Sequence, residues 1–188
     1  LMAAKLASNA KTTGVDVRAY ERYDPSQAAT WSVGTDVPYA FLAETFSLVE
    51  ETSGRLAITV LVANCIRTVL ATTPSQLYPV IALCTNKIAA SYEGIELGVG
   101  DTIMIREVAE TCGRSVEAVK SQLESMGDLG EVALASRKKQ ITFGKPKPMS
   151  AVSVLKTLRE IAQSSGKDVQ SRKKDMVKKM LVSAQGKE

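Results

Sequence analysis

Residues 54–71, with the sequence GRLAITVLVANCIRTVLA, decide the fold. Apolar side chains lie on nearly every side of this stretch when it is wound as a helix of 3.6 residues per turn. Its β-branched content could suggest a strand, but the stretch is about three times as long as an average strand. The longest nearly uncharged apolar run, residues 56–66, is too short to span a bilayer. A helix that is apolar nearly all round belongs in the middle of a bundle, so the stretch predicts a buried central helix.

Shorter helical patterns lie on both sides of this stretch. Asp36-Val37-Pro38 predicts a helix start with Asp36 as its cap and a proline in the first turn, and apolar residues then recur at three- and four-residue steps. Further helices are predicted near residues 73–84, 101–112, 115–127, 128–135, 154–162 and 176–184. Residues 137–148 are expected to form an exposed basic loop or short hairpin. The predicted fold class is all-α, an irregular multi-helix array without a substantial sheet.

The chain is expected to divide after Asp36. Residues 1–36 lack helical periodicity, so they predict an extended or disordered leader with Tyr20, Tyr23 and Trp31 as anchors onto the core. Residues 37–188 are expected to form a helical domain. Apolar residues make up 45% of the chain and charged residues 23%, which is typical of a globular protein. No basic stretch followed by an apolar one opens the chain, so no secretory signal is indicated.

The composition excludes several kinds of catalytic site. The chain contains no histidine, which rules out a Ser-His-Asp or Cys-His nucleophile and the two-histidine zinc helix. Cys65, Cys84 and Cys112 are far apart in the sequence and have neither metal-ligand spacing nor the pattern of a disulfide framework. We expect them to be buried small apolar side chains in a protein of a reducing compartment. No catalytic and no metal-binding residue is predicted.

The charge is unevenly distributed. Residues 1–136 carry 10 Lys and Arg against 16 Asp and Glu, a net charge of −6, whereas residues 137–188 carry 14 against 4, a net charge of +10. This excess suggests a polyanionic partner, although basic helices are often only solvated. The candidate contacts include Lys138, Lys139, Lys173 and Lys174. Aromatic residues do not interleave with them apart from Phe143, which favours the backbone of a duplex over stacked single-strand bases.

Ser53-Gly54-Arg55 stands where the long helix is expected to begin. The free backbone N–H groups and the positive end of the dipole make a helix start an anion site, and an arginine adds a two-pronged donor for phosphate. The alternative is an ordinary helix cap followed by a surface arginine. Gly98-Val99-Gly100 resembles a dinucleotide-binding glycine motif, but Ile103 stands at the position of its third glycine, so a turn is the better interpretation.

Several motifs resemble one family in the same order along the chain. They are Val37-Pro38-Tyr39, Thr45-Phe46, Glu50-Glu51, Ser53-Gly54-Arg55-Leu56, Glu96-Leu97-Gly98-Val99-Gly100-Asp101, Gly127-Asp128, Ser136-Arg137, Arg159-Glu160-Ile161-Ala162 and Lys173-Lys174. Together, over residues 20–184, they resemble the N-terminal DNA-binding domain of the eukaryotic replicative, type I ATP-dependent DNA ligases. The resemblance implies a helical array on the minor-groove side of nicked duplex DNA, with a DNA-contacting arginine at Arg55. It also implies that Gly98 and Gly100 are structural.

The departures from that family limit what this chain is expected to do. The adenylation motif, a lysine followed by x-Asp-Gly, is absent, and Lys167-Asp168 does not continue in that way. The adenylation domain, the OB-fold domain and a basic loop of the family's DNA-binding domain are missing as well. Residues 37–188 are therefore expected to be the first part of that domain and to need no cofactor, whereas ATP and Mg²⁺ serve the intact enzyme.

The resemblance implies nick sealing in replication, repair and recombination for the parent protein, in the nucleus or in an organellar form. The expected partners of this fragment are nicked duplex DNA and the ligase's own adenylation and OB-fold domains, and no membrane. We expect it to hold the sugar-phosphate backbone without regard to sequence, since phosphate contacts carry no sequence information. A helical protein–protein interaction scaffold is the alternative.

Overall fold

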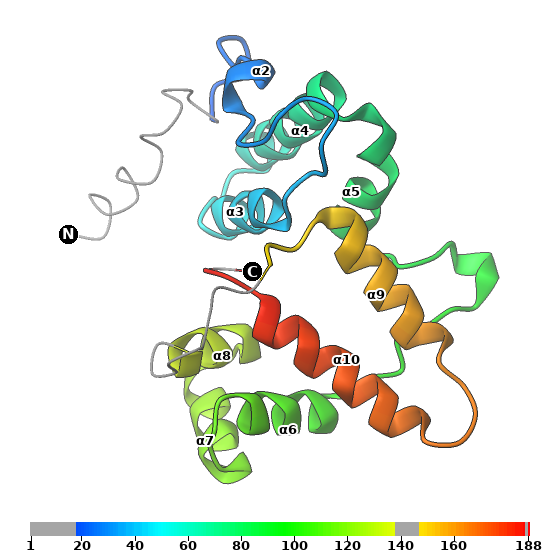
Figure 1. The fold of residues 1–188 in the computed structure, drawn as a ribbon. Helices are drawn as coiled ribbons and strands as arrows, with labels where there is room; N and C mark the ends of the chain where they lie inside the picture. The colour runs from blue at the N-terminus through cyan, green and yellow to red at the C-terminus, as the bar shows by residue number, and fades with distance from the viewer. Residues whose placement is uncertain (1–17, 138–146, 187) are drawn as a thin grey trace. The chain divides into compact units, whose positions relative to one another are not determined.

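The structure is a computed structural model that describes residues 18–137, 147–186 and 188. Its α-helices are α2 (Pro25–Ala28), α3 (Tyr39–Glu50), α4 (Arg55–Thr72), α5 (Leu77–Cys84), α6 (Asp101–Thr111), α7 (Val116–Met126), α8 (Leu129–Arg137), α9 (Ala151–Gln163) and α10 (Val169–Ser183). Two single 3-10 turns are η2 (Pro74–Gln76) and η3 (Ser91–Glu93). The described residues contain no strand, and one isolated backbone bridge joins Pro38 to Ser150. The all-α class is confirmed (Figure 1).

The chain folds as two compact units. Of the residues described, the first unit comprises 18–85 together with 150–152, and the second comprises 86–137, 147–149, 153–186 and 188. Each unit has its own hydrophobic cluster. That of the first unit is built from Val37, Leu42, Cys65, Val69, Val80 and Ala151. That of the second unit is built from Ile105, Val108, Ala109, Val119 and Val132.

The long helix α4 is central to the first unit, as the sequence predicts, because it packs against α2, α3 and α5. It is not buried all round, since Leu56 is 77% and Leu70 is 48% exposed. Its inner face instead includes Asn64 and Thr68, which are almost fully buried. By length and composition alone α4 could cross a membrane, a test that the core helix of a soluble protein also passes. It is the one such helix among the residues described.

The polar residues on α4 bind the segment that precedes α3. The Asn64 side chain donates to the carbonyl of Ala19 at 3.1 Å, and the hydroxyl of Thr68 lies 2.5 Å from that of Tyr23. The Arg67 guanidinium lies over the rings of Tyr20 and Tyr23, 5.1 and 5.5 Å from their centroids. The described part of the expected extended or disordered leader, residues 18–36, is therefore held against α4 and is not disordered. The rest of that expectation, residues 1–17, lies outside the described residues.

The start of α3 also differs from the sequence prediction. Pro38 is the residue before the first helical turn, and Asp36 does not cap it. The side-chain amide of Gln76 instead bridges the approach, donating to the Asp36 carboxylate at 2.5 Å and accepting from the backbone N–H of Val37 at 3.0 Å. Two of the three predicted anchors are in place, since Tyr23 is 4% exposed and Trp31 packs edge-on against Phe41 with 4.8 Å between ring centroids. Tyr20 is 57% exposed and meets α4 through the Arg67 guanidinium.

In the second unit, α6 packs against α7 and α10, and α7 packs against α8. Ser115 caps α7 as predicted, because its hydroxyl accepts from the N–H of Ala118 at 3.2 Å. Gly127, with φ +77°, ends the same helix. Asp101 is the first residue of α6 rather than its cap, which is Gly100. Most of the predicted basic loop, residues 138–146, lies outside the described residues.

Candidate nucleic-acid interface

The first turn of α4 is open to solvent. Ser53, Gly54, Arg55 and Leu56 are all exposed. Gly54 precedes the helix in an extended conformation, with φ −90° and ψ 121°, and no side chain caps the turn. The carbonyl of Gly54 accepts the first helical bond, from the N–H of Ile58 at 2.9 Å. The N–H groups of the residues between them have no intrahelical acceptor, because an α-helix leaves its first donors unpaired.

Arg55 is free within the described residues, where its guanidinium makes neither a hydrogen bond nor an ion pair that would hold it back. Its backbone is fixed, since the Arg55 carbonyl accepts from the Thr59 hydroxyl at 2.9 Å. A charged donor beside unpaired amides at the positive end of an 18-residue helix suits a phosphate. The first unit is not basic as a whole, because its described residues hold four Lys and Arg against six Asp and Glu. The candidate site is therefore local to this turn.

Lys173, which the sequence places among the DNA contacts, is used inside the second unit instead. The side chain is 7% exposed, and its ammonium donates to the carbonyl of Leu97 at 3.0 Å and to that of Gly98 at 3.5 Å. Gly98 has φ +60°, and a Cβ at this position would lie 2.9 Å from the Lys173 Nζ. The glycine thus allows the loop to come close to the lysine. A buried ammonium with backbone acceptors is a structural group, so this prediction is corrected.

Lys174 and Lys178 face acidic residues of α6. Glu107 is 2% exposed, and its burial raises the pKa of its carboxyl, with repulsion from Glu110 adding to the rise and Lys174 and Lys178 opposing it. Lys178 pairs with Glu110, with 2.5 Å between Nζ and Oε1. The pairing raises the pKa of Lys178 and lowers that of Glu110. The ammonium groups of Lys174 and Lys178 on α10 therefore interact with carboxylates of α6.

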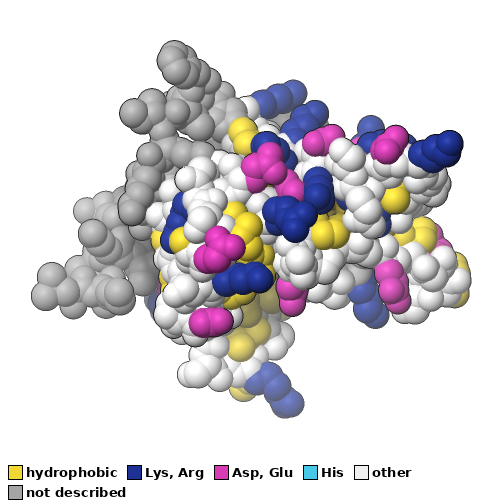
Figure 2. Space-filling view, turned by 90° about the horizontal axis from the view of Figure 1, so that it is seen from below, with side chains coloured by type: hydrophobic (Ala, Val, Ile, Leu, Met, Phe, Trp, Pro, Cys, Tyr) yellow, Lys and Arg dark blue, Asp and Glu magenta, His cyan; other side chains and the backbone are white. Residues whose placement is uncertain are grey.

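The other residues predicted to contact DNA are not gathered in one place among the described residues. Lys138 and Lys139 lie outside the described residues. Ser53, Gly54 and Arg55 come together at one exposed turn, and Lys174 is half-buried on α10 in the other unit. On the face that Figure 2 shows, basic and acidic side chains are interspersed and neither sign forms a continuous patch. No group of His, Cys, Asp and Glu that could hold a metal ion occurs within the residues that were described.

Comparison with known sequences places the chain in a family. Residues 38–188 match the family described as DNA ligase N terminus. The chain is 43% identical to DNA ligase 1 of Dictyostelium discoideum over 180 residues, which are 96% of this chain and 15% of that protein. It is 42% identical to DNA ligase 1 of Arabidopsis thaliana over 160 residues, 85% of this chain and 20% of that protein. A third relative, DNA ligase 1 of Drosophila melanogaster, is 37% identical over 94% of this chain and 24% of its own length.

This chain belongs to the DNA ligase N-terminal family. It spans between 15% and 24% of the length of these three relatives, so it corresponds to a small part of each.

Several of the residues that carry the resemblance to the ligase family have partners within their own unit. Arg159 donates from Nε to the carbonyl of Ile88 at 2.6 Å and so holds α9 to the chain before η3. The buried hydroxyl of Ser136 accepts from Arg114 at 2.6 Å. The carboxylate of Asp128 accepts from the N–H of Glu131 at 2.8 Å in the first turn of α8. Sequence reasoning missed Arg114, because its partners, Gln122 and Ser136, lie 8 and 22 residues further along the chain.

Proposed function

We propose that this chain is a duplex-DNA-binding portion of an ATP-dependent DNA ligase, which grips the sugar-phosphate backbone from the minor-groove side. The observation that supports this most directly is the open first turn of α4. Arg55 is exposed there beside unpaired amides, whereas Arg159, Lys173 and Lys174, basic residues of the family motifs whose side chains are described, act on groups of the second unit. Binding of this kind is independent of base sequence, since it uses phosphates.

The catalytic steps belong to other parts of a ligase. Sealing needs a lysine that takes AMP from ATP with Mg²⁺, transfer of AMP to the 5′-phosphate and attack by the 3′-hydroxyl. The Lys-x-Asp-Gly motif is absent from these 188 residues, so the chain by itself forms no adenylate. Its partners in the whole protein are the adenylation and OB-fold domains. The site of action is the nucleus, or an organelle, where replication, repair and recombination leave nicks.

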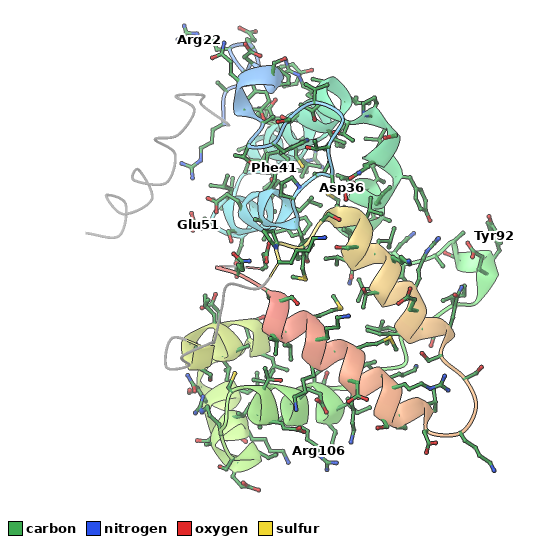
Figure 3. The ribbon with its side chains drawn as sticks, in the orientation of Figure 1. Arg22, Asp36, Phe41, Glu51, Tyr92 and Arg106 are labelled. Carbon is green, nitrogen blue, oxygen red and sulfur yellow. The ribbon has the colours of Figure 1, made fainter. Side chains whose placement is uncertain are left out.

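The test is a salt titration of binding to a nicked duplex, followed by fluorescence anisotropy. Replacing Arg55 by Ala weakens binding by about 1–3 kcal/mol if one charge-assisted contact is lost. It also lowers the dependence of log affinity on log salt by about one phosphate contact. The matched control is Arg22→Ala, because Arg22 is an exposed arginine of the same unit near α2, away from the start of α4 (Figure 3).

Each contrary result has a definite meaning. If Arg55→Ala unfolds the chain, the arginine is structural and the phosphate site fails. If Arg55→Ala and Arg22→Ala weaken binding equally, the contact is a diffuse charge effect and not a site. If Arg55→Ala changes neither folding nor binding, the first turn of α4 is an ordinary helix end.

A protein-interaction surface is the second candidate function. The observation that favours it is Tyr92 on η3, which is 91% exposed and points away from its loop into solvent (Figure 3). Tyrosine is enriched among the residues that dominate binding at protein interfaces. In this case the chain binds nicked duplex weakly, and the anisotropy signal has no steep dependence on salt.

A further inference from the structure

Cys65 and Cys84 are two thiols of the first unit that take no part in the proposed DNA contact. Cys65 on α4 is 2% exposed, and Cys84, the last residue of α5, is half-buried. Both belong to the same apolar cluster, where α4 packs directly against α5. Both are free thiols, and they are near enough for each to shift the pKa of the other. They stand 19 residues apart in the chain, so the sequence alone shows no pair.

The two sulfurs have unequal surroundings. The hydrogen bond with Cys65 lowers the pKa of Cys84, against the opposing effect of its partial burial. The hydrogen bond with Cys84 raises the pKa of Cys65, and burial raises it further. Cys84 is therefore the more acidic of the two thiols, and as the half-buried one it is also the one that solvent reaches more easily, since Cys65 is 2% exposed. A thiolate that solvent can reach is the form of cysteine that oxidants attack, and a neighbouring thiol completes a disulfide.

We propose that Cys65 and Cys84 form a peroxide-responsive modification site, in which oxidation links α4 to α5 by a disulfide. The Cys84 sulfur attacks one oxygen of hydrogen peroxide, an S–O bond forms and the O–O bond breaks. The leaving hydroxide takes a proton and becomes water, and Cys84 is now a sulfenic acid. The Cys65 sulfur then attacks that of Cys84 and gives up its proton. The S–S bond forms, the S–O bond breaks, and a second water leaves. The two thiols lose two electrons and the peroxide gains them.

The link has a local mechanical effect. It closes a loop that contains η2 and holds the C-terminal half of α4 to the end of α5. A closed loop removes conformations from the unfolded chain, so oxidation raises the melting temperature of the first unit. The proposed phosphate contact at Arg55 lies ten residues before Cys65 on the same helix, or about 15 Å at the rise of an α-helix. Disulfide formation therefore leaves duplex binding unchanged, and this inference does not depend on the proposed function.

The experiment treats the reduced, purified chain with hydrogen peroxide at low protein concentration and follows its intact mass. The expected product has lost two hydrogen atoms and regains them on treatment with dithiothreitol. Trypsin cleaves after Arg55, Arg67 and Lys87, so the two cysteines fall in separate peptides, 56–67 and 68–87. Without reductant, mass spectrometry should find these two peptides joined.

Three variants make the outcome decisive. Cys112→Ala should form the link as fast as the wild type, because Cys112 is at the end of α6 in the other unit. Cys65→Ala should stop at a Cys84 sulfenic acid, which dimedone traps. Cys84→Ser, at a half-buried position, should leave Cys65 reduced; its helical circular dichroism shows whether it folds. The inference is overturned if the joined peptides do not form, if Cys112 reacts before Cys84, or if Cys65 oxidises equally fast in Cys84→Ser.

Discussion

Arg55 in the first unit and Lys173 in the second are both basic residues of motifs shared with the ligase family, yet they are placed in opposite ways. Arg55 is exposed at the first turn of α4 and makes no side-chain bond among the described residues. Lys173 is 7% exposed and donates to the carbonyls of Leu97 and Gly98. The charge of a motif residue therefore does not reveal its role. What distinguishes the two is whether the charged group already has acceptors inside its own unit.

The physical reason lies in the cost of burial. An ammonium has three donors and is stable in the interior only when acceptors replace water. The loop at Leu97-Gly98 supplies two such acceptors because its backbone turns at Gly98, where φ is +60°. At the start of α4 the situation is reversed, since the unpaired groups are backbone donors and an arginine beside them adds further donors. An acceptor from another molecule can therefore pair with the donors at the start of α4.

The largest expected effect comes from Lys173→Met, which keeps much of the stem and removes the charge. The two carbonyls lose a charged donor, so the free energy of unfolding should fall by about 2–3 kcal/mol. Urea denaturation followed by circular dichroism measures it. Lys179→Met is the control, because Lys179 is exposed on the same helix. If Lys173→Met keeps its stability and loses duplex binding instead, Lys173 acts as Arg55 is proposed to act and the comparison fails.

A smaller loss is expected from Gly98→Ala. An alanine at φ +60° is strained by about 1–2 kcal/mol, and its methyl group would meet the Lys173 Nζ at 2.9 Å. In the Lys173→Met background the colliding atom is gone, so the second substitution should cost less than in the wild type. Gly100→Ala is the control, since Gly100 has φ −91° and nothing within 4 Å of a Cβ. Equal losses for Gly98→Ala in both backgrounds would show that the loop does not depend on the lysine.

The smallest effect concerns Lys174 and is seen in the pH dependence of stability. Burial raises the pKa of Glu107, so the folded state holds this proton more tightly than the unfolded state. The stability from Glu107 is then present below its ordinary pKa of 4.5 and declines as the pH rises through the higher folded value. Lys174→Met removes an opposing charge and should extend that decline to higher pH, while Glu107→Gln should abolish it. If denaturation experiments find the same pH dependence of stability in Lys174→Met as in the wild type, the Lys174 ammonium does not act on Glu107.

Local patterns were enough to predict the helices, but contacts across long stretches of sequence were not. Periodicity located α4, and a serine and a glycine marked the ends of α7 correctly. Aromatic residues suggested anchors for segment 18–36, but its hydrogen bonds were not predicted, because they reach 45 residues along the chain, from Tyr23 to Thr68 and from Ala19 to Asn64. In the sequence these polar residues of α4 only interrupt an apolar pattern.

Separation along the chain also explains which parts of the candidate site could be predicted from the sequence. The exposed turn at Arg55 follows from a short motif at a helix start, so it could be proposed from the sequence and from the resemblance together. The internal role of Lys173 depends on carbonyls 75 and 76 residues away, at Gly98 and Leu97. A run of basic residues gives no sign of such acceptors, and its net charge suggested a polyanion instead.

The stacking of Arg67 on Tyr20 and Tyr23 bears on where this fold can be cut. The family match begins at residue 38, but α4 is held to residues that come well before it. A shortened chain that starts at the family boundary would remove the partners of Asn64 and Thr68, which are 1% and 0% exposed, and would leave these two polar side chains without them. Such a fragment would lose the hydrogen bond from Asn64 to Ala19 and the contact of Arg67 with Tyr20, so a stable fragment of this fold has to include residues 19–37 as well.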